Sequence, residues 1–344
     1  MSLYPLIRPL AFALDAETAH RLTIKALKIM PPRRPPDFPT SLGIRVAGID
    51  FPTPVGLAAG FDKDAEVAEQ MLSQGFGFVE VGTLTPRPQD GNPKPRLFRL
   101  SEDHAVINRM GFNNCGQPAA YGRLELDMRL PGIIGVNIGA NKDSIDRIAD
   151  YASGVRVMAP VAKYLTINIS SPNTPGLRQL QDEGALNALL DAVNGARPKG
   201  GPPIFLKVAP DLGEGEPDQI VRVAIEHGVD AIIVANTTIS RPVLKSRFAD
   251  EQGGLSGTPL KTLALKALRD FHSASAGQIP LIGVGGIATA DDAWERLRAG
   301  ASLVQLYSAM VYEGPGIARR IAKHLAERLE REGIGNISEL VGTA

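Results

Sequence analysis

From residue 54 onward, eight short apolar runs alternate with helix-length segments. The apolar runs, which we interpret as strands, are residues 54–58, 78–81, 132–138, 164–169, 204–208, 231–235, 280–284 and 302–307. Helical patterns include residues 64–74, 217–227, 259–271, 290–299 and 316–331. Continuous apolar strands separated by helices indicate a parallel sheet covered on both faces. We therefore predict an α/β fold, a closed (β/α)₈ TIM barrel. The alternative is an open doubly wound sheet, which is less favoured because polar residues follow nearly every predicted strand.

The first 40 residues have a different pattern. Apolar side chains recur at helical spacing at Leu3, Leu6, Ile7, Leu10, Ala13 and Leu14. Asp15 is the expected N-cap of a second helix, which ends near Met30 because residues 31–36 contain four prolines. We predict a helical extension over residues 1–40 and a barrel domain over residues 41–344. Basic residues flank the apolar stripe, so the extension suits a membrane interface, but a hairpin packed on the barrel fits the same pattern.

Composition and charge exclude several classes of function. The formal net charge is zero, so nothing in the composition indicates the basic surface that nucleic-acid binding requires. A single cysteine, Cys115, excludes disulfides and cysteine-based zinc sites, and a reduced intracellular setting follows weakly. None of the five histidines follows a predicted barrel strand, so we expect neither a metal site nor a Ser-His-Asp triad. No apolar run approaches the length that spans a bilayer, and the N-terminus lacks a secretion signal.

Polar residues and glycines gather where the predicted strands end. They occupy residues 59–63, 82–83, 137, 168–173, 207, 236–238, 285–286 and 307–308. Barrel enzymes carry their chemistry at this end of the strands. An asparagine amide can both donate and accept hydrogen bonds at the edge of a planar ring such as a pyrimidine or an isoalloxazine. A lysine ammonium can pair with a substrate carboxylate or stabilise the negative charge of a reduced flavin. Residues 283–286 form a glycine-rich turn of the kind that binds phosphate in barrels.

Seven motifs, in order along the chain, resemble those of the dihydroorotate dehydrogenase family. They are residues 59–63, 83–88, 108–114, 168–176, 236–238, 253–257 and 283–287. Ser171 stands where the second class of this family has its catalytic serine and the first class has cysteine. The N-terminal extension is also similar to that of class 2, where it attaches the enzyme to the membrane and admits quinone. The resemblance therefore implies oxidation of (S)-dihydroorotate to orotate in pyrimidine biosynthesis, with FMN as hydride acceptor and a quinone as final acceptor.

The resemblance also implies a role for each matching residue. Ser171 is the expected catalytic base. Expected FMN contacts are Ala59, Gly60, Phe61, Asp62, Lys63, Thr83, Asn137, Asn168, Lys207, Ala235, Gly257, Gly286, Tyr307 and Ser308. Expected substrate contacts are Lys63, Asn108, Arg109, Met110, Gly111, Phe112, Asn168, Asn173, Asn236 and Thr237. The expected quinone path passes His20, Arg99 and Tyr307. One departure is visible at Ala235, where the family often has threonine, and the lost hydrogen bond is worth about 1 kcal/mol.

Partners and location follow from the same resemblance. We expect a monomer that contacts membrane lipid peripherally on the cytoplasmic face of the bacterial inner membrane, with no nucleic-acid partner and no metal. Two alternatives stay open from the residues: another flavin-dependent barrel enzyme, such as a dihydropyrimidine or dihydrouridine reductase, and a non-catalytic flavin-binding membrane module. The presence of both Ser171 and Lys63 argues against the second, because flavin binding alone requires neither.

Overall fold

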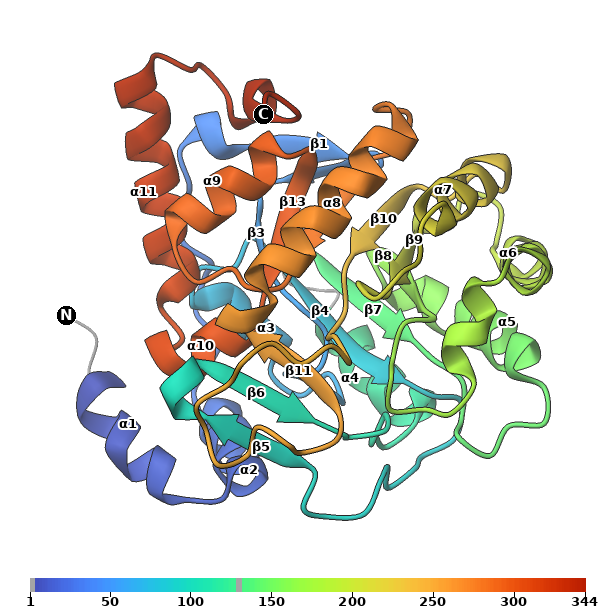
Figure 1. Ribbon diagram of the computed structural model, residues 1–344, viewed down its shortest axis with the longest axis horizontal. Coiled ribbons are helices and arrows are strands. Elements are labelled where there is room, and N and C mark those ends of the chain that lie inside the picture. The colour runs from blue at the N-terminus through green and yellow to red at the C-terminus, as the bar shows by residue number, and fades with distance from the viewer. Residues whose placement is uncertain (1–3, 128–131) are drawn as a thin grey trace.

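The centre of the molecule is a closed barrel of parallel strands (Figure 1), and the computed structural model describes residues 4–127 and 132–344. In order around the barrel, the strands are β3 (Val55–Leu57), β4 (Phe78–Leu84), β7 (Ile134–Ile138), β8 (Tyr164–Asn168), β9 (Ile204–Val208), β10 (Ala231–Val234), β12 (Leu281–Val284) and β13 (Ala301–Leu306). β13 pairs with β3, which closes the ring. The predicted (β/α)₈ barrel is confirmed, and each predicted strand contributes to it.

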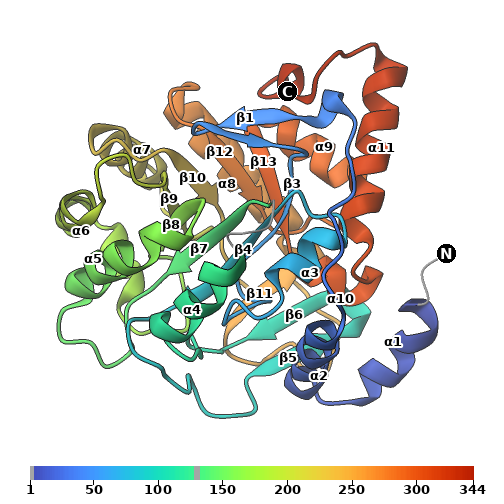
Figure 2. The same ribbon diagram turned by 180° about the vertical axis from the view of Figure 1, so that it is seen from behind.

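Helices surround the barrel on its outer face, as Figures 1 and 2 both show. They are α3 (Ala68–Ser73), α4 (Gln117–Asp127), α5 (Arg147–Met158), α6 (Glu183–Ala196), α7 (Glu216–Glu226), α8 (Lys261–Ser275), α9 (Ala290–Arg298), α10 (Ser308–Glu313) and α11 (Ile317–Glu332). The predicted helices over 217–227, 290–299 and 316–331 lie within about a residue of their observed bounds. α3 begins four residues later than predicted because the Asp62 carboxylate accepts hydrogen bonds from the backbone N–H groups of Glu66 and Val67, which holds residues 62–67 as a loop.

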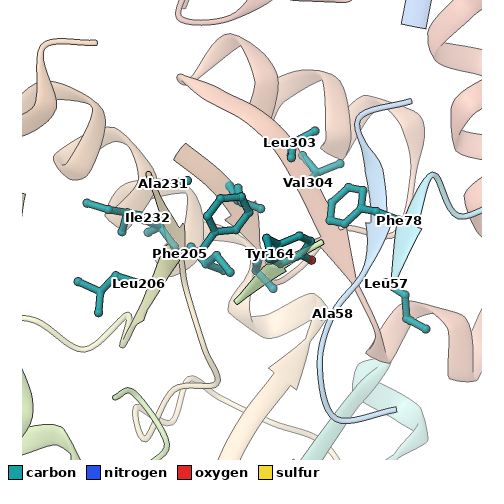
Figure 3. Close-up of a cluster of buried hydrophobic side chains, with 14 of the residues drawn as sticks. Leu57, Ala58, Phe78, Tyr164, Phe205, Leu206, Ala231, Ile232, Leu303 and Val304 are labelled. Atoms are coloured by element: carbon teal, nitrogen blue, oxygen red, sulfur yellow. The ribbon is translucent and has the colours of Figure 1, made fainter. Parts of the chain in front are cut away.

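Aromatic rings fill the barrel interior, where glycines on neighbouring strands leave room for them (Figure 3). A Cβ at Gly56 would lie 2.2 Å from the Phe78 ring, and one at Gly135 would lie 2.0 Å from the Tyr164 ring. The rings of Tyr164 and Phe205 stack with their centroids 4.5 Å apart. The interior is therefore a packed core, and any ligand must bind at an end of the barrel.

Two small antiparallel units lie at opposite ends of the barrel, as the two ribbon views agree. One is a hairpin of β1 (Ile44–Val46) and β2 (Ile49–Phe51). The other is a three-stranded sheet of β5 (Leu97–Leu100), β6 (Ala105–Asn108) and β11 (Gly254–Gly257), at the carboxyl ends of the barrel strands. Neither unit was predicted, because strands of three or four residues carry too little alternation to be recognised.

The N-terminal extension forms two helices, α1 (Tyr4–Ala13) and α2 (Ala16–Ile29), as predicted. The Asp15 side chain accepts a hydrogen bond from the Thr18 N–H at 2.9 Å, which caps α2. Leu3, which was assigned to the first helix, lies outside the described residues. Both helices lie at the same end of the molecule as β5 and β6 (Figures 1 and 2), and α2 packs on β5. No helix within the described ranges combines the length and apolar character needed to cross a bilayer.

Candidate active site

A cavity of about 330 Å³ lies at the carboxyl ends of the barrel strands and continues between α1 and α2. Its walls come from strand ends, from the β5–β6–β11 sheet and from the N-terminal helices. Most of the predicted site residues line it: Ala59, Gly60, Phe61, Lys63, Thr83, Asn108, Met110, Gly111, Phe112, Asn168, Ser171, Asn173, Lys207, Ala235, Asn236, Thr237, Gly257, Gly286, Tyr307 and Ser308, together with His20 and Arg99. The structure thus brings the three predicted groups of residues to one continuous space.

Three predicted residues do not line this cavity. Asp62 is buried behind it, and both its carboxylate oxygens are engaged by the 62–67 loop. Arg109 turns outward, where its guanidinium lies 2.7 Å from Glu251 Oε2 and 4.6 Å from the centre of the Phe98 ring. Asn137 is fully buried beneath the cavity floor. The Asp62 and Asn137 side chains can therefore affect ligand binding only indirectly, by positioning the residues they contact.

Asn137 joins a chain of buried amides and hydroxyls across three barrel strands. Its Oδ1 accepts hydrogen bonds from Thr83 Oγ1 at 2.6 Å and from Asn168 Nδ2 at 3.1 Å. The Asn168 amide also donates to Thr83 Oγ1, and its Oδ1 accepts from Ser170 Oγ at 2.8 Å. Asn236 Nδ2 donates to Ser170 Oγ at 2.8 Å. Each amide is thus held in one orientation before any ligand binds.

Beneath this chain, Glu80 is a fully buried carboxylate in the barrel interior. It accepts hydrogen bonds from Asn137 Nδ2 at 2.7 Å and from Gln305 Nε2 at 2.9 Å. The hydroxyls of Tyr164 and Thr166 donate to it at 3.3 and 3.1 Å. Sequence reasoning missed this residue. The detectable signal was a carboxylate within the predicted strand 78–81, whose other residues are apolar.

Lys207 and Gly286 supply features that suit an anionic flavin cofactor. Lys207 lines the cavity, burial lowers its pKa, and the charge of Glu80 acts in the opposite direction. Its ammonium donates to no protein acceptor among the described residues, so a donor is left to meet a ligand. Gly286 has φ +68°, and a Cβ there would lie 2.3 Å from Lys261 Cα. Glycine therefore allows this turn, which lines the cavity, to pack directly against the start of α8.

Two adjacent serines, Ser170 and Ser171, follow β8, and the structure separates their environments. Ser170 is fully buried, and its hydroxyl is occupied by Asn168 and Asn236. Ser171 lines the cavity, and its Oγ accepts a hydrogen bond from the Asn173 N–H at 3.3 Å. Only the second serine has a hydroxyl directed to a space where a ligand can reach it.

Lys63 lines the same cavity as two asparagines that join separate segments of the chain. Its Nζ donates to the Gly60 carbonyl oxygen at 2.8 Å, and burial lowers the pKa of its ammonium to about 8. Asn173 Nδ2 donates to Asn108 Oδ1 at 3.2 Å, which ties the 168–176 segment to β6. A charged donor next to amide groups can pair with a carboxylate while reading the edge of a ring.

Aromatic contacts continue the site toward the N-terminal helices. The rings of His20 and Phe61 meet edge to face at 5.4 Å, and those of Phe61 and Tyr307 at 5.8 Å. Burial lowers the pKa of His20 to about 4, so at neutral pH its Nε2 donates to the Phe61 carbonyl oxygen at 2.8 Å as a neutral imidazole. Arg99 lies 4.4 Å from the centre of the Phe12 ring and donates to the Phe12 carbonyl oxygen. Arg99 and Glu313 both line the cavity, and the charges of both act on Tyr4 of α1.

Three other features of the site were not predicted. Asn113 lines the cavity, and its Oδ1 is buried without a hydrogen-bond partner among the described residues. Arg296 on α9 is buried and donates to the Lys261 and Gly285 carbonyl oxygens at 2.7 and 3.0 Å. A buried ion pair joins Glu17 of α2 to Arg96. Only Asn113 belonged to a recognised motif, so the other residues carried no local signal.

Comparisons with known proteins give one consistent result. A family model described as dihydroorotate dehydrogenase matches residues 41–329. Proteins named dihydroorotate dehydrogenase (quinone) from Erythrobacter litoralis and Novosphingobium aromaticivorans are 64% and 63% identical to the chain, over 99% and 100% of both sequences. A crystal structure of DHODH from Eimeria tenella in complex with ferulenol is 43% identical, with a TM-score of 0.91 over 95% of each chain.

Proposed function

The chain belongs to the dihydroorotate dehydrogenase family, and we propose that the cavity at the barrel mouth is where its reaction takes place. The protein oxidises dihydroorotate to orotate in pyrimidine biosynthesis, with a quinone as electron acceptor, and is flavin-dependent like its family. The observation that carries the proposal is that one continuous cavity joins Ser171 and Lys63 to the two N-terminal helices. Both half-reactions can therefore use a single bound flavin.

FMN is the flavin we propose for this site. When bound, it accepts the hydride that leaves C6 of dihydroorotate. Lys207 would lie against its ring system as the unpaired cation, and Gly286 would admit its phosphate to the main chain of the turn after β12. The remaining proposed contacts are Ala59, Gly60, Phe61, Lys63, Thr83, Asn168, Ala235, Gly257, Tyr307 and Ser308, with Asp62 and Asn137 supporting them from behind.

The substrate is proposed to lie between Lys63 and the asparagines. The Lys63 ammonium pairs with the substrate carboxylate, and Asn108, Asn173 and Asn236 read the N–H and C=O groups of the ring. The neighbouring contacts would come from Met110, Gly111, Phe112, Asn168 and Thr237, whereas the outward side chain of Arg109 limits it to holding its loop. Buried amides of this kind discriminate against analogues that leave them unpaired.

Ser171 is the proposed base that removes the proton from C5. A serine hydroxyl is a weak base, so it must pass on its own proton as it gains that of the substrate. Ser171 lines the cavity, whereas the hydroxyl of Ser170 is already committed to Asn168. The two serines can therefore be tested against each other.

The test is an anaerobic stopped-flow measurement of flavin absorbance on mixing with dihydroorotate and then with a quinone. Ser171→Ala should slow bleaching by about 10² to 10⁴, the usual contribution of a general base, while orotate still binds. Ser170→Ala is the comparison variant: its hydroxyl does not line the cavity but holds Asn168 and Asn236, so its loss should weaken ligand binding and leave bleaching at saturating dihydroorotate much less affected than in Ser171→Ala. Near-normal bleaching of the Ser171 variant would refute the assignment. Failure of a quinone to restore the colour would refute the route through the helices.

We propose that residues 1–40 form a unit that admits quinone past His20, Arg99 and Tyr307, and that residues 41–344 form the FMN-binding barrel. Exposed apolar side chains gather on α1 and α2, including Leu6, Leu10 and Ile29. Such a surface supports peripheral contact with lipid, which we place on the cytoplasmic face of the bacterial inner membrane. We further propose that the protein acts as a monomer.

A further inference from the structure

A buried ion pair connects α2 to the barrel. The guanidinium of Arg96 donates to Glu17 from Nε at 3.0 Å and from Nη2 at 2.8 Å, and both side chains are almost wholly buried. Burial alone would raise the pKa of Glu17, but Arg96 and Lys94 outweigh it and hold that pKa at about 2. The carboxylate therefore stays charged across the working range of pH. A paired geometry of this kind fixes orientation as well as distance.

Arg96 uses its remaining donor to hold a loop. Its Nη1 donates to the carbonyl oxygens of Asp90 at 2.5 Å and of Asn92 at 2.8 Å. Gly91, between them, has φ +80°, and a Cβ there would lie 2.3 Å from the Met110 carbonyl oxygen. The loop is thus pressed against residues 109–111 and is fixed by an arginine that Glu17 orients.

Asn92 connects the loop held by Arg96 to the proposed substrate site. Its Nδ2 donates to the Arg109 carbonyl oxygen at 3.0 Å and to the Asn173 carbonyl oxygen at 3.1 Å. Asn173 in turn donates from its side chain to Asn108 Oδ1 and from its backbone N–H to Ser171 Oγ. A continuous series of hydrogen bonds therefore runs from α2 to the serine and the two asparagines.

We propose that Glu17 is a positioning residue for dihydroorotate, acting through Arg96 and Asn92 on Asn173 and Ser171. The N-terminal extension then serves the substrate half of the site as well as quinone access. This inference rests on the proposed function, because it takes Asn173 and Ser171 as substrate contacts. Glu17 itself does not line the cavity. The charge of Glu17 also raises the pKa of Lys63, so orotate binding is compared well below pH 8, where Lys63 stays protonated and the effect of Glu17 on the substrate is through geometry.

The experiment compares Glu17→Gln with Lys28→Gln in the full-length holoenzyme. Glutamine keeps the shape of Glu17 but removes the charge that orients Arg96. Lys28 forms another ion pair between α2 and the barrel, with Glu66 at 2.5 Å, but contacts neither Arg96 nor the loop it holds. Orotate binding is measured by titration of the flavin absorbance, and quinone KM is measured in steady state. The wild type must first bind orotate and be bleached by dihydroorotate, and failure there would refute the proposed function instead.

The expected result is a rise of about tenfold in the orotate Kd of Glu17→Gln, the effect of losing one well-placed hydrogen bond, with FMN retained and Lys28→Gln unchanged. An unchanged orotate Kd, or a change in quinone KM alone, would overturn the proposal. So would an equal loss in Lys28→Gln, which would indicate general loosening of α2.

If Glu17→Gln folds poorly, a double-mutant cycle between Glu17→Asp and Asn92→Ala decides the question, because aspartate keeps the buried charge beside Arg96 but is too short for both of the contacts that Glu17 makes. Non-additive effects on the orotate Kd support the series of hydrogen bonds, and additive effects overturn it.

Discussion

Replacement of Glu80 by glutamine should destabilise the barrel and weaken FMN binding together. Four groups donate to this carboxylate, from Asn137, Tyr164, Thr166 and Gln305. The least costly placement of the new amide keeps its oxygen facing the three donors at Oε2 and points its NH₂ group at Asn137 Nδ2. In the wild type, Asn137 Nδ2 and Glu80 Oε1 lie 2.7 Å apart. In the variant, two NH₂ groups would face each other across this gap.

Asn137 cannot turn over to relieve this clash without further cost. Its Oδ1 already accepts from Thr83 and Asn168, so a flip would break both of those hydrogen bonds. The loss of one charge-assisted hydrogen bond costs about 1.5–3 kcal/mol, and an unsatisfied buried donor costs about 1–3 kcal/mol. A net destabilisation of about 3 kcal/mol is expected, which lowers the unfolding midpoint by roughly 4 °C in a chain of this size.

FMN affinity should change in a pH-dependent way in the same variant. Glu80 supports the protonated form of Lys207, so its neutralisation lowers the pKa of that lysine further. The proton is then lost at a lower pH, so the FMN Kd of Glu80→Gln should begin to rise at a lower pH than that of the wild type.

The assay combines calorimetry of the holoprotein with FMN titration followed by flavin fluorescence. Tyr164→Phe is the control, because it removes only the 3.3 Å hydroxyl contact to the same carboxylate and should cost about 1 kcal/mol or less. A Glu80→Gln midpoint equal to that of the wild type, with unchanged FMN affinity, would refute this account of the buried network.

Two further predictions concern the ends of the proposed ligand site. Burial lowers the pKa of Lys63 to about 8; the ammonium is lost as pH rises through that value, so orotate affinity should fall by up to about tenfold per pH unit above it. The fall should be absent in Lys63→Met, and a flat wild-type titration would contradict the prediction. Arg296→Met removes the donors to the Lys261 and Gly285 carbonyl oxygens and should raise the FMN Kd about tenfold or more. Flavin fluorescence measures this Kd, and an unaltered value would mean that Arg296 does not shape the phosphate turn.

The barrel was predictable because its signal is local and repeated. Each strand is a continuous apolar run, since it is buried on both faces, and the eight runs recur between helices. Parallel strands of a barrel present their carboxyl ends at one side, so the polar residues that follow them were expected to meet. The confirmed fold and the cavity lined by Ser171, Lys63 and Lys207 both follow from that one pattern.

The buried supports of the site were not predictable from local pattern. Glu80 and Asn137 lie 57 positions apart in sequence and Glu17 and Arg96 lie 79 apart, so only the folded chain shows that they are partners. The same holds for Arg109, which belongs to a recognised motif although its side chain pairs with Glu251 across a separation of 142 residues.

The barrel, the end at which ligands bind and the residue types found there were all predictable, because periodicity and strand-end position are properties of neighbouring residues. Only the packed chain shows which of two adjacent serines reaches the cavity, which asparagine lies beneath its floor, and that α2 holds the loop beside Asn173. These outcomes depend on side-chain direction and on hydrogen bonds between distant segments, which are defined only once the chain has packed.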